Sequence, residues 1–299
     1  MMKKIIIAGG TGLVGKKLTW KLLKEGYTVT IVTRHIPDER PNGELTFVTW
    51  DQIDSAVEGA YGIVNLAGAS IVGKRWTEEY KAILRSSRID ATRQLVAAIQ
   101  RASQKPKVLV NASAMGYYGM LPKAYGFVES DPAGMDFLAQ ICVDWEKEAF
   151  AAEKLGIRVV CIRSAIILDK TEGALPQIVT PFKLYVGGSI GSGTQPFPWI
   201  HIDDEVNIFF TALENTKYKG PINAVSPEQV SQKEFSTILG KVLHRPSALP
   251  VPQFVLRGLY GQGATVITSG VVLEPKKLKE LAFIFKYPKL TNALTSLLI

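Results

Sequence analysis

The stretch ASAMGYYGM, residues 112–120, brings together three side chains that can take part in proton transfer. Ser113 precedes two adjacent tyrosines, Tyr117 and Tyr118, which stand between glycines. A side chain can pass a proton to a reacting carbonyl when its pKa lies close to the working pH. A tyrosine with an ordinary pKa of about 10 needs a nearby cation for this task. We therefore take Ser113, Tyr117 and Tyr118 as the candidate catalytic residues.

Three interpretations of the tyrosine pair are open. One tyrosine could act as an acid, assisted by Ser113 and by a cation from elsewhere in the chain. One could instead only pack against a cofactor or a substrate. Both could be plain wall residues, and aromatic side chains near strand ends pack more often than they catalyse. The cations available to the first interpretation are Lys74, Arg75, Arg88 and Lys123.

A second set of residues suits a phosphate-bearing ligand. Gly9, Gly12 and Gly15 stand between the apolar run KKIIIA and the amphipathic run LVGKKLTWKLLKEG. Glycines at such a turn let the chain bend sharply, let the backbone approach a pyrophosphate and let the helix pack close to the strand. The free amides at the start of the helix then attract negative charge. A ligand-free turn is the alternative, but a strand before the glycines and a helix after them favour a dinucleotide site.

The residues that follow the second apolar run, TVTIVT, distinguish two dinucleotides. An NAD site usually carries an Asp or Glu about 20 residues beyond the glycines, on the ribose 2′-hydroxyl. Thr33, Arg34 and His35 occupy this region, and no carboxylate occurs before Asp38. A guanidinium suits a 2′-phosphate as a forked cation facing an anion. Arg34 could also be a solvated loop residue, but the pattern favours NADP(H) over NAD.

These candidate residues need a scaffold, and the apolar pattern predicts one. Runs of strand length alternate with helical patterns up to Ser164, which predicts an α/β fold with a Rossmann-type, doubly wound parallel sheet. Beyond Ser164 the alternation stops and Gly and Pro become frequent. We expect residues 1–169 to form an NADP(H)-binding Rossmann domain, to which 199–226 return, and 170–299 to form mainly a smaller C-terminal substrate lobe.

Composition excludes several other classes of protein. The 299 residues are 46% hydrophobic and 21% charged, which is typical of a globular protein. No charge-free run reaches the length of a membrane span, and the first residues lack a signal-peptide pattern, so we expect a cytoplasmic protein. Cys142 and Cys161 lie in apolar runs and are expected to be unpaired. Three histidines and two cysteines without ligand spacing argue against a metal site. The net charge of +8 fits a solvated surface or a phosphorylated ligand, and no nucleic-acid motif occurs.

Several motifs together resemble those of the extended short-chain dehydrogenase/reductases. The sequence is most similar to bacterial epimerase-family proteins of the NAD-dependent epimerase/dehydratase type. The motifs are GGTGLVG, NLAG, ASAMGYYG, PWIHIDD, KRWTEE, SRIDATR, DFLAQICVDWE and a C-terminal segment around RPSALPVPQF. The resemblance spans the chain and implies a Rossmann-type domain, a C-terminal substrate lobe and, in many such reductases, a homodimer. The cofactor-binding residues that it implies are Gly9, Thr11, Gly12, Leu13, Val14, Gly15, Thr33, Arg34, Leu66, Ala67, Gly68 and Arg88.

The chain departs from this family at one point. The extended reductases carry a Tyr-x-x-x-Lys pair on the helix after the catalytic serine, where the lysine lowers the pKa of the tyrosine. The corresponding run DFLAQICVDWEKEA contains no tyrosine. When Glu146 is aligned with a glutamate common on that helix, Leu138 and Cys142 occupy the two catalytic positions. Lys147 does not have the required spacing.

Other residues near the predicted cleft have a structural as well as a functional interpretation. Asp203 is expected to cap the helix DEVNIFF, which leaves His201 as a structural residue that could reach the substrate. Arg163 is expected to face the cleft and to pair with a substrate anion or with Asp203. Trp199 and the glycine-rich run GGSIGSG could border the cleft, or the run could be a plain connector.

Two functions from different classes follow from these patterns. The first is an NADP(H)-dependent oxidoreductase or epimerase that acts on a small carbonyl compound or a nucleotide-sugar-like substrate. The alternative is a non-catalytic NADP(H)-binding redox sensor that acts through a protein partner, since the Tyr-x-x-x-Lys pair is absent. Nucleic acids and membranes are not expected partners, although the basic surface leaves nucleic-acid binding as a third and weaker hypothesis.

Overall fold

A seven-stranded parallel sheet forms the centre of the computed structural model, which describes residues 2–37, 43–71, 74–119, 126–248 and 269–299. The strand order is β3-β2-β1-β4-β5-β6-β9, and every neighbouring pair is parallel. The order reverses direction between β1 and β4, which is the point where doubly wound sheets bind their ligands. The predicted α/β Rossmann-type architecture is confirmed. The strands are β1 Lys4–Ala8, β2 Thr28–Val32, β3 Leu45–Val48, β4 Gly62–Asn65, β5 Val108–Ala114, β6 Arg158–Ser164 and β9 Gly220–Ala224.

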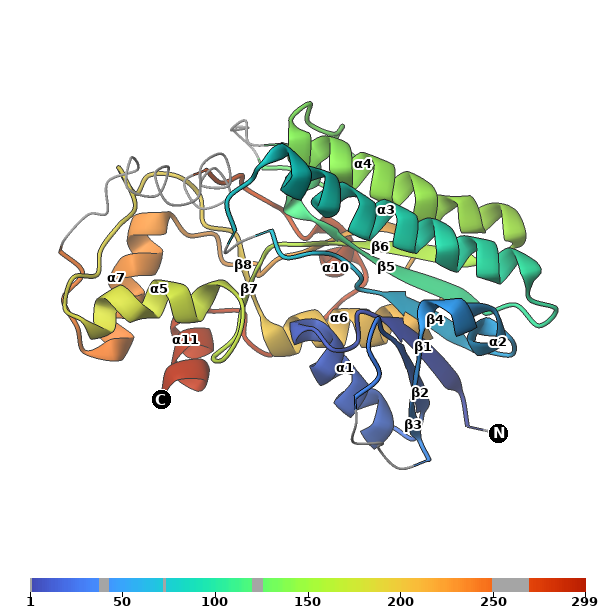
Figure 1. The fold of residues 1–299 in the computed structure, drawn as a ribbon. Coiled ribbons are helices and arrows are strands. Elements are labelled where there is room, and N and C mark those ends of the chain that lie inside the picture. Colours follow the sequence, from blue (N-terminus) through green and yellow to red (C-terminus); the bar gives the residue numbers. More distant parts are fainter. Residues whose placement is uncertain (1, 38–42, 72–73, 120–125, 249–268) are drawn as a thin grey trace.

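Helices cover both faces of this sheet, as right-handed crossovers between parallel strands require (Figure 1). Helices α3 and α4 pack together on one face, and α1 and α6 pack together on the other. The helices are α1 Leu13–Lys24, α2 Ile53–Val57, α3 Glu78–Arg101, α4 Phe137–Phe150 and α6 Ile202–Glu214, with short 3-10 turns η1 Trp50–Gln52, η2 Met115–Tyr118 and η3 Ala151–Leu155. In the part of the chain that the structure describes, no helix is long and apolar enough to cross a membrane.

A second group of elements lies beyond the carboxyl end of the sheet (Figure 1). Strands β7 and β8 form a separate parallel pair, and helix α7 packs against both α5 and α11. Helix α10 instead packs against β9 at the edge of the main sheet. The elements of this group are β7 Ile166–Leu168, α5 Ala174–Lys183, β8 Trp199–His201, α7 Gln232–Leu243 and α11 Leu290–Leu298, whereas α10 comprises Lys276–Glu280.

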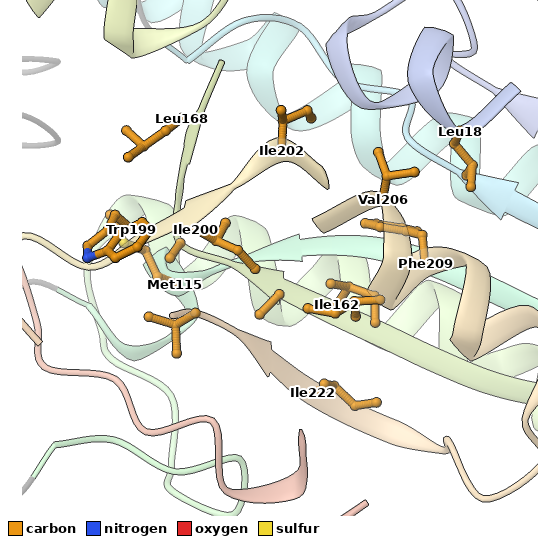
Figure 2. Close-up of a cluster of buried hydrophobic side chains, with 14 of the residues drawn as sticks. Leu18, Met115, Ile162, Leu168, Trp199, Ile200, Ile202, Val206, Phe209 and Ile222 are labelled. Carbon is orange, nitrogen blue, oxygen red and sulfur yellow. The ribbon is translucent and has the colours of Figure 1, made fainter. Parts of the chain in front are cut away.

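The core follows from the two-residue alternation of buried strands. In β1, Ile5 and Ile7 pack into the cluster on the α1 and α6 side, whereas Ile6 and Ala8 pack into the cluster on the α3 and α4 side. Figure 2 shows part of the first cluster, in which Leu18, Val206 and Phe209 from the two helices meet Ile162 and Ile222 of the sheet. The same cluster extends to the C-terminal helix through Leu294. One continuous apolar core therefore joins the sheet to the C-terminal elements.

Trp199 belongs to this core and does not border a cleft. Its side chain is fully buried, and Figure 2 places it beside Ile200 on β8. The expectation that Trp199 lies at the edge of the substrate cleft is therefore wrong. Both cysteines, Cys142 and Cys161, are buried and unpaired, as the sequence predicts.

Candidate functional site

A cavity of about 620 Å³ runs along the carboxyl ends of the central strands. One end is formed by the loop between β1 and α1, and the middle by residues that follow β4, β5 and β6. The other end reaches the C-terminal elements through Ile178 and Phe182 of α5 and Gln232 of α7. A single cavity thus connects the glycine loop to the predicted substrate lobe.

The glycine loop is shaped so that side chains are excluded from it. Gly9 has a φ of +78°, and a Cβ there would lie 2.6 Å from the carbonyl oxygen of Leu66. A Cβ on Gly15 would lie 2.5 Å from the carbonyl oxygen of Gly9. Gly12 is different, because its nearest neighbour would be 3.4 Å away. Gly9 and Gly15 are therefore needed for the loop to pack, whereas Gly12 leaves the outer surface of the loop free of a side chain.

The first turn of α1 is open to an anion. Its N-cap, Gly12, makes no side-chain capping bond, and the turn contains no acidic residue. Free amides at a helix N-terminus attract phosphate through their hydrogen-bonding capacity and through the helix dipole. The backbone cradle and the uncapped helix therefore fit the pyrophosphate of a dinucleotide.

The predicted cofactor residues divide into two groups. Those on the cavity wall are Gly9, Gly12, Leu13, Val14, Gly15, Leu66, Gly68 and Arg88. Those off the described wall are Thr11, Thr33, Arg34 and Ala67. Arg34 is exposed just beyond the carboxyl end of β2, and Thr33 bonds to the backbone of His35. The assignment of Thr33 and Arg34 to the adenosine ribose stays a prediction.

Arg88 is a buried cation on the cavity wall. It is 8% exposed, and its two terminal nitrogens donate to the carbonyl oxygens of Leu84 at 3.0 Å and Ala69 at 2.9 Å. Burial lowers the pKa of the guanidinium. No ion pair joins Arg88 to a carboxylate in the described part of the chain. A buried charge is costly without a counter-charge, so this site suits an anionic group of a ligand.

Ser113 belongs to a buried charged network on the α4 side of the sheet. Its hydroxyl donates to Oε1 of Glu146 at 2.7 Å. Arg163 donates to both oxygens of Glu146, each at 2.8 Å, because β5 and β6 place Ser113 and Arg163 side by side. Burial opposes the charge of Arg163, but its hydrogen bonds to Glu146 outweigh this cost and raise its pKa. The expectation that Arg163 faces the cleft or pairs with Asp203 is wrong, because Glu146 occupies its guanidinium.

The two tyrosines lie behind this network and not on the described cavity wall. The Tyr118 hydroxyl donates to Asn223 at 2.7 Å and accepts from Arg163 at 2.9 Å. Burial raises the pKa of Tyr118 to about 12. The central carbon of the Arg163 guanidinium lies over the Tyr117 ring, 3.3 Å from its centroid. Of the three interpretations, this geometry favours tyrosines that pack.

Two of the cations proposed to assist the tyrosines lie elsewhere. Arg88 faces the Trp145 ring, and Lys74 lies over the Tyr80 ring. Lys123 lies outside the described residues. The cation beside the tyrosines is Arg163, which sequence reasoning assigned to the cleft.

His201, and not Asp203, caps helix α6. Its ring nitrogen Nδ1 accepts a hydrogen bond from the amide of Asp203 at 3.0 Å. Burial lowers the pKa of His201 to about 4, so the ring is neutral and can act as an acceptor. The Asp203 carboxylate instead pairs with Lys286 at 2.7 Å. His201 is therefore structural, as predicted, but the prediction for Asp203 is wrong.

A pair that sequence reasoning missed lies on the opposite face from Ser113. Ser164, the last residue of β6, donates its hydroxyl to Oε1 of Glu205 in the first turn of α6, at 2.5 Å. Both residues line the cavity, and the Glu205 side chain is fully buried. Its second oxygen, Oε2, has no hydrogen-bond partner among the described residues. Burial raises the pKa of this carboxyl to about 8.

A signal for Glu205 was present in the sequence. Ile202, Val206 and Phe209 form the apolar stripe of α6, and Glu205 falls within that stripe, three residues after Ile202. An acidic residue at such a position is either paired or has a raised pKa.

Comparison with known proteins identifies the family of the chain. The family described as "NAD dependent epimerase/dehydratase family" matches residues 5–224. The chain belongs to this family. A second match, to a domain of unknown function called DUF1731, covers residues 251–297.

Relatives that align with nearly all of this epimerase/dehydratase family member share between 32% and 39% of its residues. An epimerase family protein from Arabidopsis thaliana, the chloroplastic SDR39U1 homolog, is 39% identical over 98% of this chain and 86% of its own length. The epimerase family protein YfhF from Bacillus subtilis is 38% identical over 98% of this chain and 97% of its own. The crystal structure of human SDR39U1 with NADPH is 32% identical, with a TM-score of 0.89 and 98% of both chains covered.

More distant structures share the fold alone. A UDP-glucuronic acid 4-epimerase from Bacillus cereus in complex with NAD is 18% identical, with a TM-score of 0.78. Within this epimerase/dehydratase fold, Leu138 and Cys142 of α4 line the cavity of the present chain. Burial raises the pKa of the Cys142 thiol to about 12. The two positions that the sequence prediction aligned with the Tyr-x-x-x-Lys pair therefore line the cavity, and neither side chain can relay a proton at neutral pH.

Proposed function

We propose that this epimerase/dehydratase family member is a cytoplasmic NADP(H)-dependent oxidoreductase that acts on a small, largely apolar carbonyl compound. The observation that carries the proposal is the single cavity from the uncapped start of α1, past Ser113, to the C-terminal elements. At one end it meets the site that fits a pyrophosphate, and at the other end its wall is mostly aliphatic and aromatic. NADPH, when bound, would supply a hydride to a carbonyl carbon.

Two observations support NADP(H) over NAD(H). Arg34 follows β2 in place of the acidic residue that binds a free 2′-hydroxyl. The human relative at 32% identity was crystallised with NADPH, whereas a neighbour solved with NAD shares only 18% of residues.

The cavity wall favours an apolar substrate over a nucleotide sugar. Beyond the glycine loop the described lining is mostly aliphatic and aromatic, including Ile71, Met115, Leu138, Ile141, Ile166, Ile167, Ile178, Phe182 and Phe197. Arg88 is the only cationic side chain in that lining. A nucleotide sugar carries a diphosphate in addition to the cofactor's own phosphates and would need further cations. A carbonyl compound with an apolar body needs none.

Turnover tests the proposal. NADPH oxidation would be followed at the nicotinamide absorbance with a panel of aromatic and aliphatic aldehydes, ketones and quinones. Deuterium from 4-labelled NADPH should appear on the product carbon. Ser113→Ala should lower kcat, since its hydroxyl is the candidate catalytic group on the cavity wall. Ser103→Ala, which changes an exposed serine outside the cavity, should not. Absence of label transfer across the panel, with NADPH bound, would exclude this activity on these carbonyl compounds.

A second function has support of its own, namely a redox sensor that binds NADP(H) without chemistry. Leu138 and Cys142 stand where the family's proton relay is expected, and both face the cavity. Such a sensor would bind NADPH and NADP⁺ with different affinities and would retain a protein partner in only one of these states. Any catalytic label transfer in the experiment above would count against it.

A further inference from the structure

The Ser164–Glu205 pair has no role in the function proposed above, yet it faces the same cavity. A carboxyl in the apolar stripe of a buried helix is costly unless it serves a polar partner. Among the described residues, the side chain of Glu205 has one hydrogen-bond partner, the Ser164 hydroxyl. Ser164 is only half-buried and lies on the cavity wall. Glu205 also lines the cavity, but its side chain is fully buried, so the Ser164 hydroxyl is the more accessible part of the pair.

The direction of the hydrogen bond determines whether Ser164 presents a donor or an acceptor to the cavity. Its hydroxyl hydrogen is given to Oε1 of Glu205. Its two lone pairs stay available, so Ser164 presents an acceptor to the cavity. The complementary ligand group is an uncharged N–H or O–H donor.

Strand geometry places this acceptor on the cofactor side of the cavity. Adjacent residues of a strand point to opposite faces, so Arg163 lies on the α4 side and Ser164 on the α6 side. Helix α6 packs against α1, whose first turn fits the pyrophosphate. Ser164 therefore shares a face with the pyrophosphate site, while Ser113 lies on the other face.

The strand order identifies which half of the dinucleotide reaches Ser164. The pyrophosphate site follows β1, and the residues predicted to face the adenosine ribose follow β2 on one side of it. Strands β4, β5 and β6 lie on the other side. A dinucleotide that spans the crevice must therefore direct its nicotinamide half towards β5 and β6. The donor group of that half is the carboxamide N–H.

We propose that Ser164, held in place by the buried Glu205, accepts a hydrogen bond from the carboxamide of the nicotinamide ring. Ser164 is the binding residue and Glu205 the positioning residue. The inference rests on the proposed function, because it requires that NADP(H) binds in this cavity. It adds a determinant for the reactive half of the cofactor, which the glycine loop does not contact.

The experiment compares ligands that differ only at the nicotinamide end. Dissociation constants would be measured by calorimetry for three ligands. These are NADP⁺, 2′-phospho-ADP-ribose, which lacks the nicotinamide ring, and 3-acetylpyridine adenine dinucleotide phosphate, which lacks the N–H donors of the carboxamide. The chains would be wild type, Ser164→Ala, Glu205→Leu, Glu205→Gln and the control Ser103→Ala, an exposed serine off the cavity wall. Thermal unfolding would establish that each variant is folded.

We expect wild type to bind NADP⁺ about fivefold more tightly than the acetylpyridine analogue, the size of one hydrogen bond. Ser164→Ala and Glu205→Leu should remove this preference and leave the affinity for 2′-phospho-ADP-ribose unchanged. Glu205→Gln keeps an acceptor for the Ser164 hydroxyl and should retain most of the preference. Ser103→Ala should match wild type.

Three results would overturn the inference. The first is a wild type without a preference for NADP⁺ over the acetylpyridine analogue, or a preference that survives Ser164→Ala. The second is a loss of affinity that is equal for all three ligands, which would indicate a distorted pocket. The third is absence of binding of every ligand to wild type, and only this one would also overturn the proposed function. Binding of NADP⁺ without a carboxamide effect would leave the proposed function standing.

Discussion

Ser113 and Ser164 lie one residue apart in the register of neighbouring strands, yet their hydroxyls donate to carboxyl groups on opposite faces of the sheet. Ser113 pairs with Arg163 across the ladder and bonds to Glu146 of α4. Ser164 follows Arg163 and bonds to Glu205 of α6. Both serines line the cavity. Their hydrogen bonds connect the cavity wall to α4 on one face of the sheet and to α6 on the other.

The raised pKa of Glu205 makes stability depend on pH. Its pKa is about 8 in the folded chain, against an ordinary value of 4.5, so the folded state binds the proton more tightly than the unfolded state. The free energy of unfolding should therefore fall as pH rises from about 4.5 to about 8, by at most about 1.4 kcal/mol per pH unit. Urea unfolding at several pH values should show that Glu205→Gln flattens this decline. A wild-type decline that Glu205→Gln leaves unchanged would mean that another group causes it.

The Glu146–Arg163 pair should be important for stability because both charges are buried. Arg163→Leu leaves the Glu146 carboxylate without its bidentate partner and should cost about 3–5 kcal/mol. Arg101→Leu provides the matched control, since Arg101 pairs with Asp54 on the surface, and should cost no more than about 1 kcal/mol. Urea denaturation of both variants at pH 7 measures the contrast. Equal losses would contradict the role given to burial.

Substitutions of two loop glycines should distinguish an effect on NADPH binding from an effect on stability. A Cβ on Gly12 meets nothing closer than 3.4 Å, so Gly12→Ala should leave the free energy of unfolding within about 0.5 kcal/mol of wild type. The added methyl projects from the loop where a pyrophosphate must approach, so NADPH affinity should fall by about tenfold or more. Gly15→Ala, with a clash at 2.5 Å against the loop backbone, should lower both stability and affinity. Unchanged NADPH binding by Gly12→Ala would place the cofactor elsewhere.

Tyr118 should prove to be a structural residue. Tyr118→Phe removes a hydroxyl that bonds to Asn223 and Arg163 in a buried site, and should cost about 1–3 kcal/mol of stability. Because Tyr118 lies off the described cavity wall, NADPH affinity and the turnover of any substrate found should stay at the wild-type level. Thermal unfolding and steady-state kinetics on the same preparation measure the two effects. A loss of kcat without a loss of stability would restore the catalytic interpretation.

Structural features that depend on a local sequence pattern could be predicted from the sequence. Alternating apolar runs predicted the parallel sheet, and Gly9, Gly12 and Gly15 predicted a loop that the structure places on the cavity wall. Leu138 and Cys142 could be placed near the site because helical spacing from Glu146 is regular. These features need only the period of a strand or a helix.

Features that depend on register between distant segments could not be predicted. The pairing of Arg163 with Glu146, and not with Asp203, requires the alignment of β5 with β6 and the packing of α4. The cap at His201 requires the ring geometry at the β8–α6 junction. Glu205 is a mixed case, because its spacing from Ile202 and Phe209 indicated an inward position, but its contact with Ser164 requires the packing of α6 on β6.

The measurement that tests the central claim most directly is the affinity of the purified chain for NADPH and NADH, followed by nucleotide fluorescence. The claim predicts tighter binding of NADPH. Arg34→Asp should weaken NADPH binding about tenfold or more, since it removes a charge-assisted contact to the 2′-phosphate, and should narrow the difference from NADH. Lys154→Asp, an exposed charge change far from the cavity, should leave both affinities unchanged. Absence of binding of either nucleotide to wild type would contradict the claim that this cavity is a dinucleotide site.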